Sequence, residues 1–299
     1  MKLSDLICAG HKDKNLKHLI PKPIRRPLGK LRAAARRFRI WLHVKNMLTG
    51  KTPDDSKVLQ DAIRRSPLTI WHNLNQWQFP MVEHDCAVIS KGIGIFQVRA
   101  RTDDLFHVLP MQEPAVEKAI RSLLRPGDTF VDAGANIGFY TVLASQLVGA
   151  QGHVISFEMI PTTAEILRAH VRQNDCSNVK NIEGALAEAS GKTLKASIMA
   201  GKSGQASIAR SSGTTEIEVK TVTRAEQLAD YPSIRLIKMD LEGAELGALQ
   251  GVEKDLGKVE AIIFENRGAQ DVVNFIKEHG FEVTRLDGNN ALGQRKLPS

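Results

Sequence analysis

The sequence predicts a doubly wound α/β domain, in which helices cover both faces of a mostly parallel sheet. Beyond Gly127, short apolar segments alternate with segments that carry apolar residues at helical spacing, and this alternation is typical of such a sheet. A glycine-containing turn follows the first apolar segment, and carboxylates or polar clusters follow four of the five. Ligands of these sheets bind at the carboxyl ends of the strands, so we expect a ligand site there.

Residue patterns place each element of this domain. The strands are predicted at 129–133, 153–158, 179–185, 234–240 and 259–265, and the helices at 113–125, 139–147, 163–174, 244–252 and 272–279. The segments 281–286 and 291–295 are expected to form a closing hairpin across Asp287-Gly-Asn-Asn290. Short β-like pieces at 193–199 and 216–222 surround a Gly/Ser-rich stretch and interrupt the alternation.

The 299 residues divide into three predicted regions. Residues 1–50 are a basic, partly amphipathic leader, 51–112 form a cap on the substrate side, and 113–299 form the ligand-binding domain. In the cap we expect a helix around 58–65, started by Asp54 or Asp55, and a hairpin of 86–90 with 93–100. The cap and the interrupting 192–222 segment are the expected walls of the substrate pocket.

The net charge of +8 is concentrated in the leader. Its first 45 residues hold thirteen Lys or Arg against two Asp, and the other 254 hold 28 basic and 31 acidic residues, a net charge of −3. A body with a slight negative charge argues against a nucleic-acid partner. The three cysteines are too few and too irregularly spaced for a disulfide framework or a zinc site, and a reducing cytoplasm is predicted.

The leader contains one basic amphipathic segment. Pro21, Pro23 and Pro27 predict that no continuous helix runs through 21–27. After them, apolar residues recur at helical spacing, with a stripe of basic residues on another side; the apolar set is Leu31, Ala35, Phe38, Trp41, Leu42 and Leu48. Either residues 28–48 touch an anionic membrane or an acidic partner, or the helix packs its apolar stripe on the body. We favour packing, because the body is close.

The turn after the first strand carries the ligand chemistry. It reads Asp132-x-Gly134-x-Asn136-x-Gly138, without the middle glycine of a dinucleotide loop and without the Gly-Lys-Ser/Thr of a mononucleotide loop. Asp132 would repel a pyrophosphate, but it suits a ligand with a sulfonium and an ammonium group. Glu158, at the end of the second strand, is placed to accept hydrogen bonds from both ribose hydroxyls.

Three blocks at matching spacing resemble the FkbM-type methyltransferases: Pro126–Thr141 with its Asp132–Gly138 turn, Phe157-Glu158, and Ile237-Lys-Met-Asp-Leu-Glu-Gly-Ala-Glu245. The resemblance covers roughly residues 113–266. It implies a class I methyltransferase sheet of seven strands with an antiparallel last strand. It also implies S-adenosylmethionine as cofactor and an O-methyl ether on a sugar, lipid-linked glycan or secondary metabolite as product.

The expected site residues follow from the strand ends. The cofactor set is Asp132, Gly134, Asn136, Gly138, Glu158, Ala185 and Asp240. The base that takes the acceptor's proton is expected among Asp240, Glu242 and Glu265, with His107 as an outsider and Asp240 preferred because it ends the central strand. An equal alternative is that Asp240 binds the methionine amine. No metal is predicted, since no second ligand set is evident.

Two other functions remain as alternatives. An NAD- or nucleotide-dependent oxidoreductase is disfavoured by Asp132 and the missing glycine. A non-catalytic, membrane-associated relative is disfavoured because Asp132, Glu158 and Asp240 are all present. The acceptor, a small molecule or glycan with a hydroxyl, has no readable code in the sequence, and neither does the oligomeric state.

Overall fold

The computed structural model describes residues 22–73, 79–186, 191–199, 202–207, 215–222, 227–266, 268 and 270–295. The part of the leader before Lys22, including Pro21, lies outside the described residues. In the described part, no helix is long and apolar enough to cross a bilayer.

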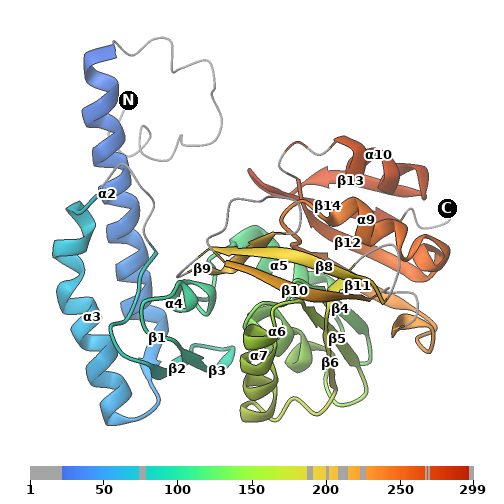
Figure 1. Ribbon diagram of the computed structural model, residues 1–299, viewed down its shortest axis with the longest axis horizontal. Coiled ribbons are helices and arrows are strands. Elements are labelled where there is room, and N and C mark those ends of the chain that lie inside the picture. The colour runs from blue at the N-terminus through green and yellow to red at the C-terminus, as the bar shows by residue number, and fades with distance from the viewer. Residues whose placement is uncertain are drawn as a thin grey trace.

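A seven-stranded sheet forms the centre of the molecule (Figure 1), and its strand order is β13-β14-β12-β11-β4-β5-β6. The strands are β4 (Thr129–Ala133), β5 (His153–Glu158), β6 (Val179–Glu183), β11 (Ile234–Met239), β12 (Val259–Glu265), β13 (Phe281–Arg285) and β14 (Asn290–Arg295). The pairs from β6 to β12 are parallel, and β14 is antiparallel to β12 and to β13. The doubly wound sheet, the closing hairpin and the antiparallel last strand are therefore confirmed.

Helices cover both faces of this sheet. They are α5 (Pro114–Leu123), α6 (Phe139–Val148), α7 (Pro161–Gln173), α9 (Glu245–Gln250), the 3₁₀ helix η2 (Glu253–Lys258) and α10 (Gln270–Glu278). Neighbouring strand residues enter different cores, since side chains alternate between the faces: Phe130 packs with α5, α6 and α7, whereas Val131 packs with α9 and α10. The same alternation sends Leu236 to the first core and Ile237 to the second.

The predicted third strand, 179–185, is wrong at its end. It divides at Gly184, whose φ of 156° breaks the strand, and Ala185–Leu186 becomes β7 of a second sheet. That sheet has the order β7-β10-β8-β9, with β8 (Thr193–Met199), β9 (Lys202–Ser207) and β10 (Thr215–Val222). The β-like pieces of the interrupting segment are confirmed, and β9 is an additional strand within it.

The N-terminal region adds two long helices and a small sheet. Its elements are α2 (Lys22–Met47), β1 (Leu48–Gly50), α3 (Pro53–Trp71), β2 (Cys86–Ser90), β3 (Gly94–Val98) and α4 (Asp104–His107). The predicted hairpin is confirmed as β2 and β3, and β1 pairs antiparallel with β2. Figure 1 shows α2 and α3 as a pair of helices beside the body.

Three predictions about this region need correction. The helix α2 starts at Lys22 and therefore includes Pro23 and Pro27. Pro23 lies in the first turn, where the backbone amides have no partner within the helix, so it costs no hydrogen bond, and Pro27 costs one. Leu48 belongs to β1 and not to the helix. The cap of α3 is Thr52, whose hydroxyl accepts from the Asp55 amide, while Asp55 accepts from the Thr52 amide in a capping box.

The helix α2 is buried along a different stripe from the predicted one. Ala34, Arg37, Trp41 and Val44 are buried, at a spacing of three or four residues. Of the predicted apolar set, Trp41 and Leu48 are buried, but Leu31, Phe38 and Leu42 are exposed. The helix does pack on the body, and it leaves a second apolar stripe uncovered.

Arg37 joins the two helices. Its guanidinium donates to the carbonyl oxygens of Thr69, His72 and Asn73 at the carboxyl end of α3, at 3.3 Å for Thr69 and 2.9 Å for Asn73. Carbonyl oxygens at the carboxyl end of a helix have no amide partner in the next turn. A buried cation there donates to them and interacts favourably with the helix dipole.

His170 on α7 ties the cap to the glycine turn. It is fully buried, its Nε2 accepts from the Gln97 amide of β3 at 2.7 Å, and its Nδ1 lies 2.6 Å from the Ile137 carbonyl oxygen. Burial lowers the pKa of His170, and accepting at Nε2 requires the neutral ring with its proton on Nδ1. One side chain therefore holds both an edge strand and the turn.

Replacing Arg37 tests this account of the helix pair. Arg37→Met keeps the apolar stem but leaves three carbonyl oxygens without their donor. We expect a loss of about 1–3 kcal/mol in unfolding free energy, measured in urea, with faster amide exchange in residues 53–73. Arg39→Met, on the exposed side of α2, is the control and should change stability by less than about 0.5 kcal/mol. Equal effects of the two changes would contradict the account.

Candidate active site

A buried lysine lies at the carboxyl end of the central strands. Lys238 on β11 is paired in register with Asp132 on β4, so both side chains point to the same face of the sheet. Asp240 follows two residues later and shares that face. The Lys238 Nζ lies 3.6 Å from the Asp240 Oδ2 and 3.9 Å from the Asp132 Oδ1, and 5.0 Å from the centre of the Tyr140 ring.

The protonation of this cluster depends on its partners. Burial alone would lower the pKa of Lys238, but the carboxylates of Asp240, Asp132 and Glu113 outweigh it and the pKa is raised. Burial also raises the pKa of Asp132, against the opposing effects of Lys238 and of Thr141, whose hydroxyl donates to the Asp132 Oδ2 at 2.7 Å. The ammonium of Lys238 is thus held by the acids around it.

The turn between β4 and α6 passes very close to the backbone that follows β11. Gly134 has a φ of 80°, and a Cβ atom at this position would lie 2.1 Å from the Asp240 carbonyl oxygen. Gly138 has a φ of 93°, and its Cβ would lie 2.4 Å from Leu167. Both positions therefore require glycine for conformation and for space. Asn136 also has a positive φ, 49°, and its buried Oδ1 makes no hydrogen bond among the described residues.

Glu158 is held at the end of β5 by two backbone amides. Its Oε2 accepts from the Asn136 amide at 2.8 Å, and its Oε1 from the Ile160 amide at 2.9 Å. Burial raises its pKa from 4.5 to about 7, although these two hydrogen bonds act in the opposite direction. The carboxylate is therefore anchored to the turn and easily protonated near neutral pH.

A cavity of about 700 Å³ opens above the turn. Eight of the nine predicted site residues line it: Gly134, Asn136, Gly138, Glu158, Ala185, Asp240, Glu242 and Glu265. Asp132 is not among the lining residues, because it is fully buried against Thr141 and Lys238. Its contact with the cofactor stays a prediction.

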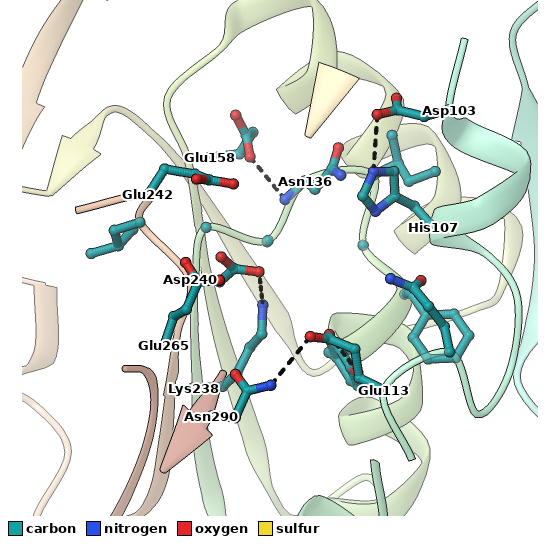
Figure 2. Close-up of a pocket in the computed structure, with 18 of the residues that line it drawn as sticks. Asp103, His107, Glu113, Asn136, Glu158, Lys238, Asp240, Glu242, Glu265 and Asn290 are labelled. Atoms are coloured by element: carbon teal, nitrogen blue, oxygen red, sulfur yellow. Dashed lines mark hydrogen bonds and ion pairs between the residues drawn. The ribbon is translucent and has the colours of Figure 1, made fainter. Parts of the chain in front are cut away.

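Three carboxylates gather on one side of the cavity (Figure 2). Oxygen atoms of Asp240, Glu242 and Glu265 all lie within 4.8 Å of one another. Glu242 has a left-handed backbone, φ 50°, directly before Gly243, and this conformation turns the chain after β11. Such a group of like charges favours a cationic ligand. The spacing would also suit a metal ion, although the sequence predicts none.

Glu113 and its partners form a wall that sequence reasoning missed. The Tyr140 hydroxyl donates to the Glu113 Oε2 at 3.1 Å, and the Asn290 amide to its Oε1 at 3.5 Å. Burial, followed by the charge of Asp240, raises the pKa of Glu113. Glu113 stands at the start of α5 and Asn290 in the closing hairpin, so their sequence signals are those of a helix start and of a turn. Lys238 lies in the Ile237–Glu245 block, but the sequence pattern predicts no role for it.

The opposite wall comes from the cap. His107 and Asp103 line the cavity, with the His107 Nε2 3.4 Å from the Asp103 Oδ2, and Figure 2 shows the pair across the cavity from Asp240. Phe79, Phe106 and Arg36 also line the cavity, and the Phe106 ring lies next to the rings of Phe79 and His107. His107, the additional candidate base from the region before the domain, therefore lines the cavity.

The cavity fits S-adenosylmethionine. Its carboxylates match the sulfonium and ammonium of that cofactor, Glu158 is placed for the ribose, and the buried Asn136 Oδ1 offers an unused acceptor. The Gly134 turn, which packs closely against the Asp240 carbonyl oxygen, also lines the cavity.

The space at Gly134 can be tested against a matched glycine. Gly134→Ala adds the cost of a positive φ, about 1 kcal/mol, and a clash with the Asp240 carbonyl oxygen. Gly127→Ala, also at a positive φ of 89° but with open space around its Cβ, adds only the first cost. We expect the former to lose more stability in urea and at least tenfold in cofactor affinity by calorimetry, and the latter to keep its affinity. Similar affinities for both variants would refute the close-approach argument.

The raised pKa of Glu158 predicts pH-dependent cofactor binding. Ribose hydroxyls donate to the ionised carboxylate, so binding must first remove its proton below a pH of about 7. The affinity should rise about tenfold per pH unit below 7 and level off above it. Glu158→Gln should bind more weakly at pH 8 and lack this rise.

Dissociation constants of both proteins, measured from pH 6 to 8, provide the test. Titration of the cofactor itself cancels in the ratio of the two constants. A ratio that stays constant with pH would exclude Glu158 as the group responsible.

Comparisons with known proteins agree with this geometry. A family model described as the methyltransferase FkbM domain matches residues 132–283. The chain is 25% identical to the methyltransferase sdnD of Sordaria araneosa, over 54% of this chain and 76% of that protein. It is 42% identical to an arsenite methyltransferase of Halobacterium salinarum over 57 residues, which are 19% of this chain and 15% of that protein.

Among solved structures, the fold is similar to a methyltransferase FkbM from Methylobacillus flagellatus, with a TM-score of 0.41 and 15% identity over 87% of this chain and 59% of that one. The family match covers half of the chain and includes the β4 turn, Glu158 and the Lys238–Glu245 block. It confirms the resemblance, the class I methyltransferase fold and the S-adenosylmethionine cofactor that the sequence predicts. The chain belongs to the FkbM family of methyltransferases.

Proposed function

We propose that this protein transfers a methyl group from S-adenosylmethionine to a hydroxyl of a glycan, a lipid-linked sugar or a secondary metabolite. The observation that carries the proposal is the position of Asp240. Asp240 follows the central strand β11 and lines the cavity, and its backbone carbonyl oxygen lies against Gly134 of the turn. A partly exposed carboxylate at this place has room to accept a proton from a hydroxyl.

On the cofactor side, the chain's own residues bind and orient. The backbone of the Gly134–Gly138 turn receives the methionine part, Glu158 accepts from the ribose, and Ala185 lines the cavity beyond them. The carboxylates of the site balance the positive charge. When bound, the cofactor supplies an electrophilic methyl group. Asp132 acts from beneath, by holding Lys238 and Thr141 in place.

On the acceptor side, Asp240 is the proposed base, with Glu242 and Glu265 beside it. With the cofactor bound, the acceptor's hydroxyl would donate to the carboxylate, which would take its proton as the oxygen bonds to the methyl carbon. The bond from that carbon to sulfur would break at the same time, and the sulfonium would leave as a neutral thioether. Lys238 holds one oxygen of Asp240, with its Nζ 3.6 Å from the Oδ2. The same carboxylates can accept further hydrogen bonds from a polyhydroxylated acceptor. The acidic site disfavours nucleic acid, whose phosphates it would repel, and an oxidoreductase is not favoured.

We also propose that the protein works in a reducing compartment such as the cytoplasm. Cys86 and Cys176 are both free and buried, and burial raises the pKa of Cys86 to about 11. Such thiols are unreactive and need no oxidising environment.

Replacing Asp240 separates its two candidate roles. Asp240→Asn cannot accept a proton, so a loss of about 10²–10⁴-fold in turnover is expected, with cofactor affinity changed less than about threefold. A methionine-amine ligand would instead weaken cofactor binding. Asp230→Asn, the same chemical change at an exposed turn, is the control and should retain full activity.

The assay uses cofactor labelled with ¹³C in its methyl group and an extract of lipids, glycans and metabolites from the source cells. The chemical shift of the transferred carbon distinguishes oxygen, nitrogen and sulfur acceptors. Label on nitrogen or sulfur would refute O-methylation, and no transfer by the wild-type protein would refute the proposed function.

A further inference from the structure

The helix α2 presents an apolar stripe that no described residue covers. Leu31, Phe38 and Leu42 are 57%, 56% and 48% exposed. They lie on one side of the helix, since their spacing of seven and four residues returns to nearly the same direction. Five of the seven large hydrophobic side chains exposed in the described part of the chain belong to α2 or α3, with Leu68 and Trp71 on α3. The uncovered apolar surface is thus concentrated on this helix pair.

Basic residues border the stripe. At about 100° per residue, Lys45 lies near one edge of it and Arg32 and Arg39 near the other, and all three are exposed. No acidic residue occurs in α2 or anywhere from 14 to 53, a segment with twelve Lys or Arg. A stripe with this border repels a second copy of itself and attracts an anionic surface.

From these observations we propose that α2 docks the protein on an anionic lipid surface. Leu31, Phe38 and Leu42 enter the boundary between headgroups and acyl chains, and Arg32, Arg39 and Lys45 contact the anionic headgroups. The helix lies in the plane of the surface, in agreement with the absence of a membrane-crossing helix from the described part of the chain. The burial of Ala34, Arg37, Trp41 and Val44 against the rest of the protein keeps the helix folded and its stripe turned outward.

The docked helix also borders the cavity. Arg36, on the side of α2 beyond Arg32 and Arg39, lines the cavity together with Phe79 and His107. Arg36 lies about 140° around the helix from the centre of the stripe. A protein seated through the stripe therefore has this part of its cavity on the far side of the helix from the lipid surface. The docking does not select an acceptor, and it does not rest on the proposed methyl transfer.

Vesicle sedimentation of the full-length protein tests the docking without any need for activity. Wild type is expected to bind vesicles of phosphatidylcholine with 30 mol% phosphatidylserine (roughly the anionic range in which basic helices respond) and not vesicles of phosphatidylcholine alone. Arg32→Gln with Arg39→Gln should weaken partitioning about 25-fold, because each cation near the surface contributes about fivefold. Leu31→Asn, Phe38→Asn and Leu42→Asn together should weaken it at least tenfold.

Matched changes elsewhere serve as controls. Lys254→Gln with Lys277→Gln removes two exposed charges from the other end of the chain, and Ile89→Asn removes an exposed apolar side chain from β2. Both should bind like wild type. Equal binding by stripe and control variants, or no preference of the wild type for anionic vesicles, would overturn the proposal. A third outcome would also overturn it: wild type forms a dimer in light scattering, the stripe variant is monomeric, and neither protein binds vesicles. Failure of vesicle binding would leave the proposed methyl transfer intact.

Discussion

Lys238 lines the candidate active site between two carboxylates, and this buried ion cluster constrains most of what surrounds it. A lysine taken out of water is costly unless it is paired, and here it is paired with Asp132 and Asp240 on two neighbouring strands. Because all three residues share one face of the pleat, the register of β4 and β11 brings them together. A slip of one residue in either strand would turn a charge into the opposite core.

The cluster also explains the order of the site above it. Asp132 holds Thr141 at the start of α6, and the turn before that helix passes against the Asp240 carbonyl oxygen. The same turn provides the Asn136 amide that donates to the Glu158 carboxylate. The strand ends, the turn and the Glu158 carboxylate therefore form one connected structure, which the family's motifs encode as three separate blocks.

The sequence revealed the part of this arrangement that depends on periodicity. Alternating apolar segments predicted the sheet, and the rule that parallel strands end at one edge predicted that Asp240, Glu265 and Glu158 would meet. It could not reveal which loops lie above that edge. Glu113 has the pattern of a helix start and Asn290 that of a turn, and only the packing of α5 and the closing hairpin brings them to the cavity. The motif around Asp132 was interpreted by charge alone, and charge does not reveal that this side chain is buried against Thr141 and Lys238. The exposed stripe of α2 was misassigned for a related reason, since two apolar stripes share one helix and the sequence does not say which is buried.

A double-mutant cycle on Asp132 and Lys238 tests the central constraint most directly. Unfolding free energies in urea at pH 8 would be measured for Asp132→Asn, Lys238→Met and the double variant. If the two groups form one buried unit, Lys238→Met leaves Asp132 without its cation and costs about 3–5 kcal/mol. Asp132→Asn costs less, because Lys238 keeps its pair with Asp240. The double variant then loses at least about 1 kcal/mol less than the two losses together. Losses that add within about 0.5 kcal/mol would show that the groups act independently and would contradict the account.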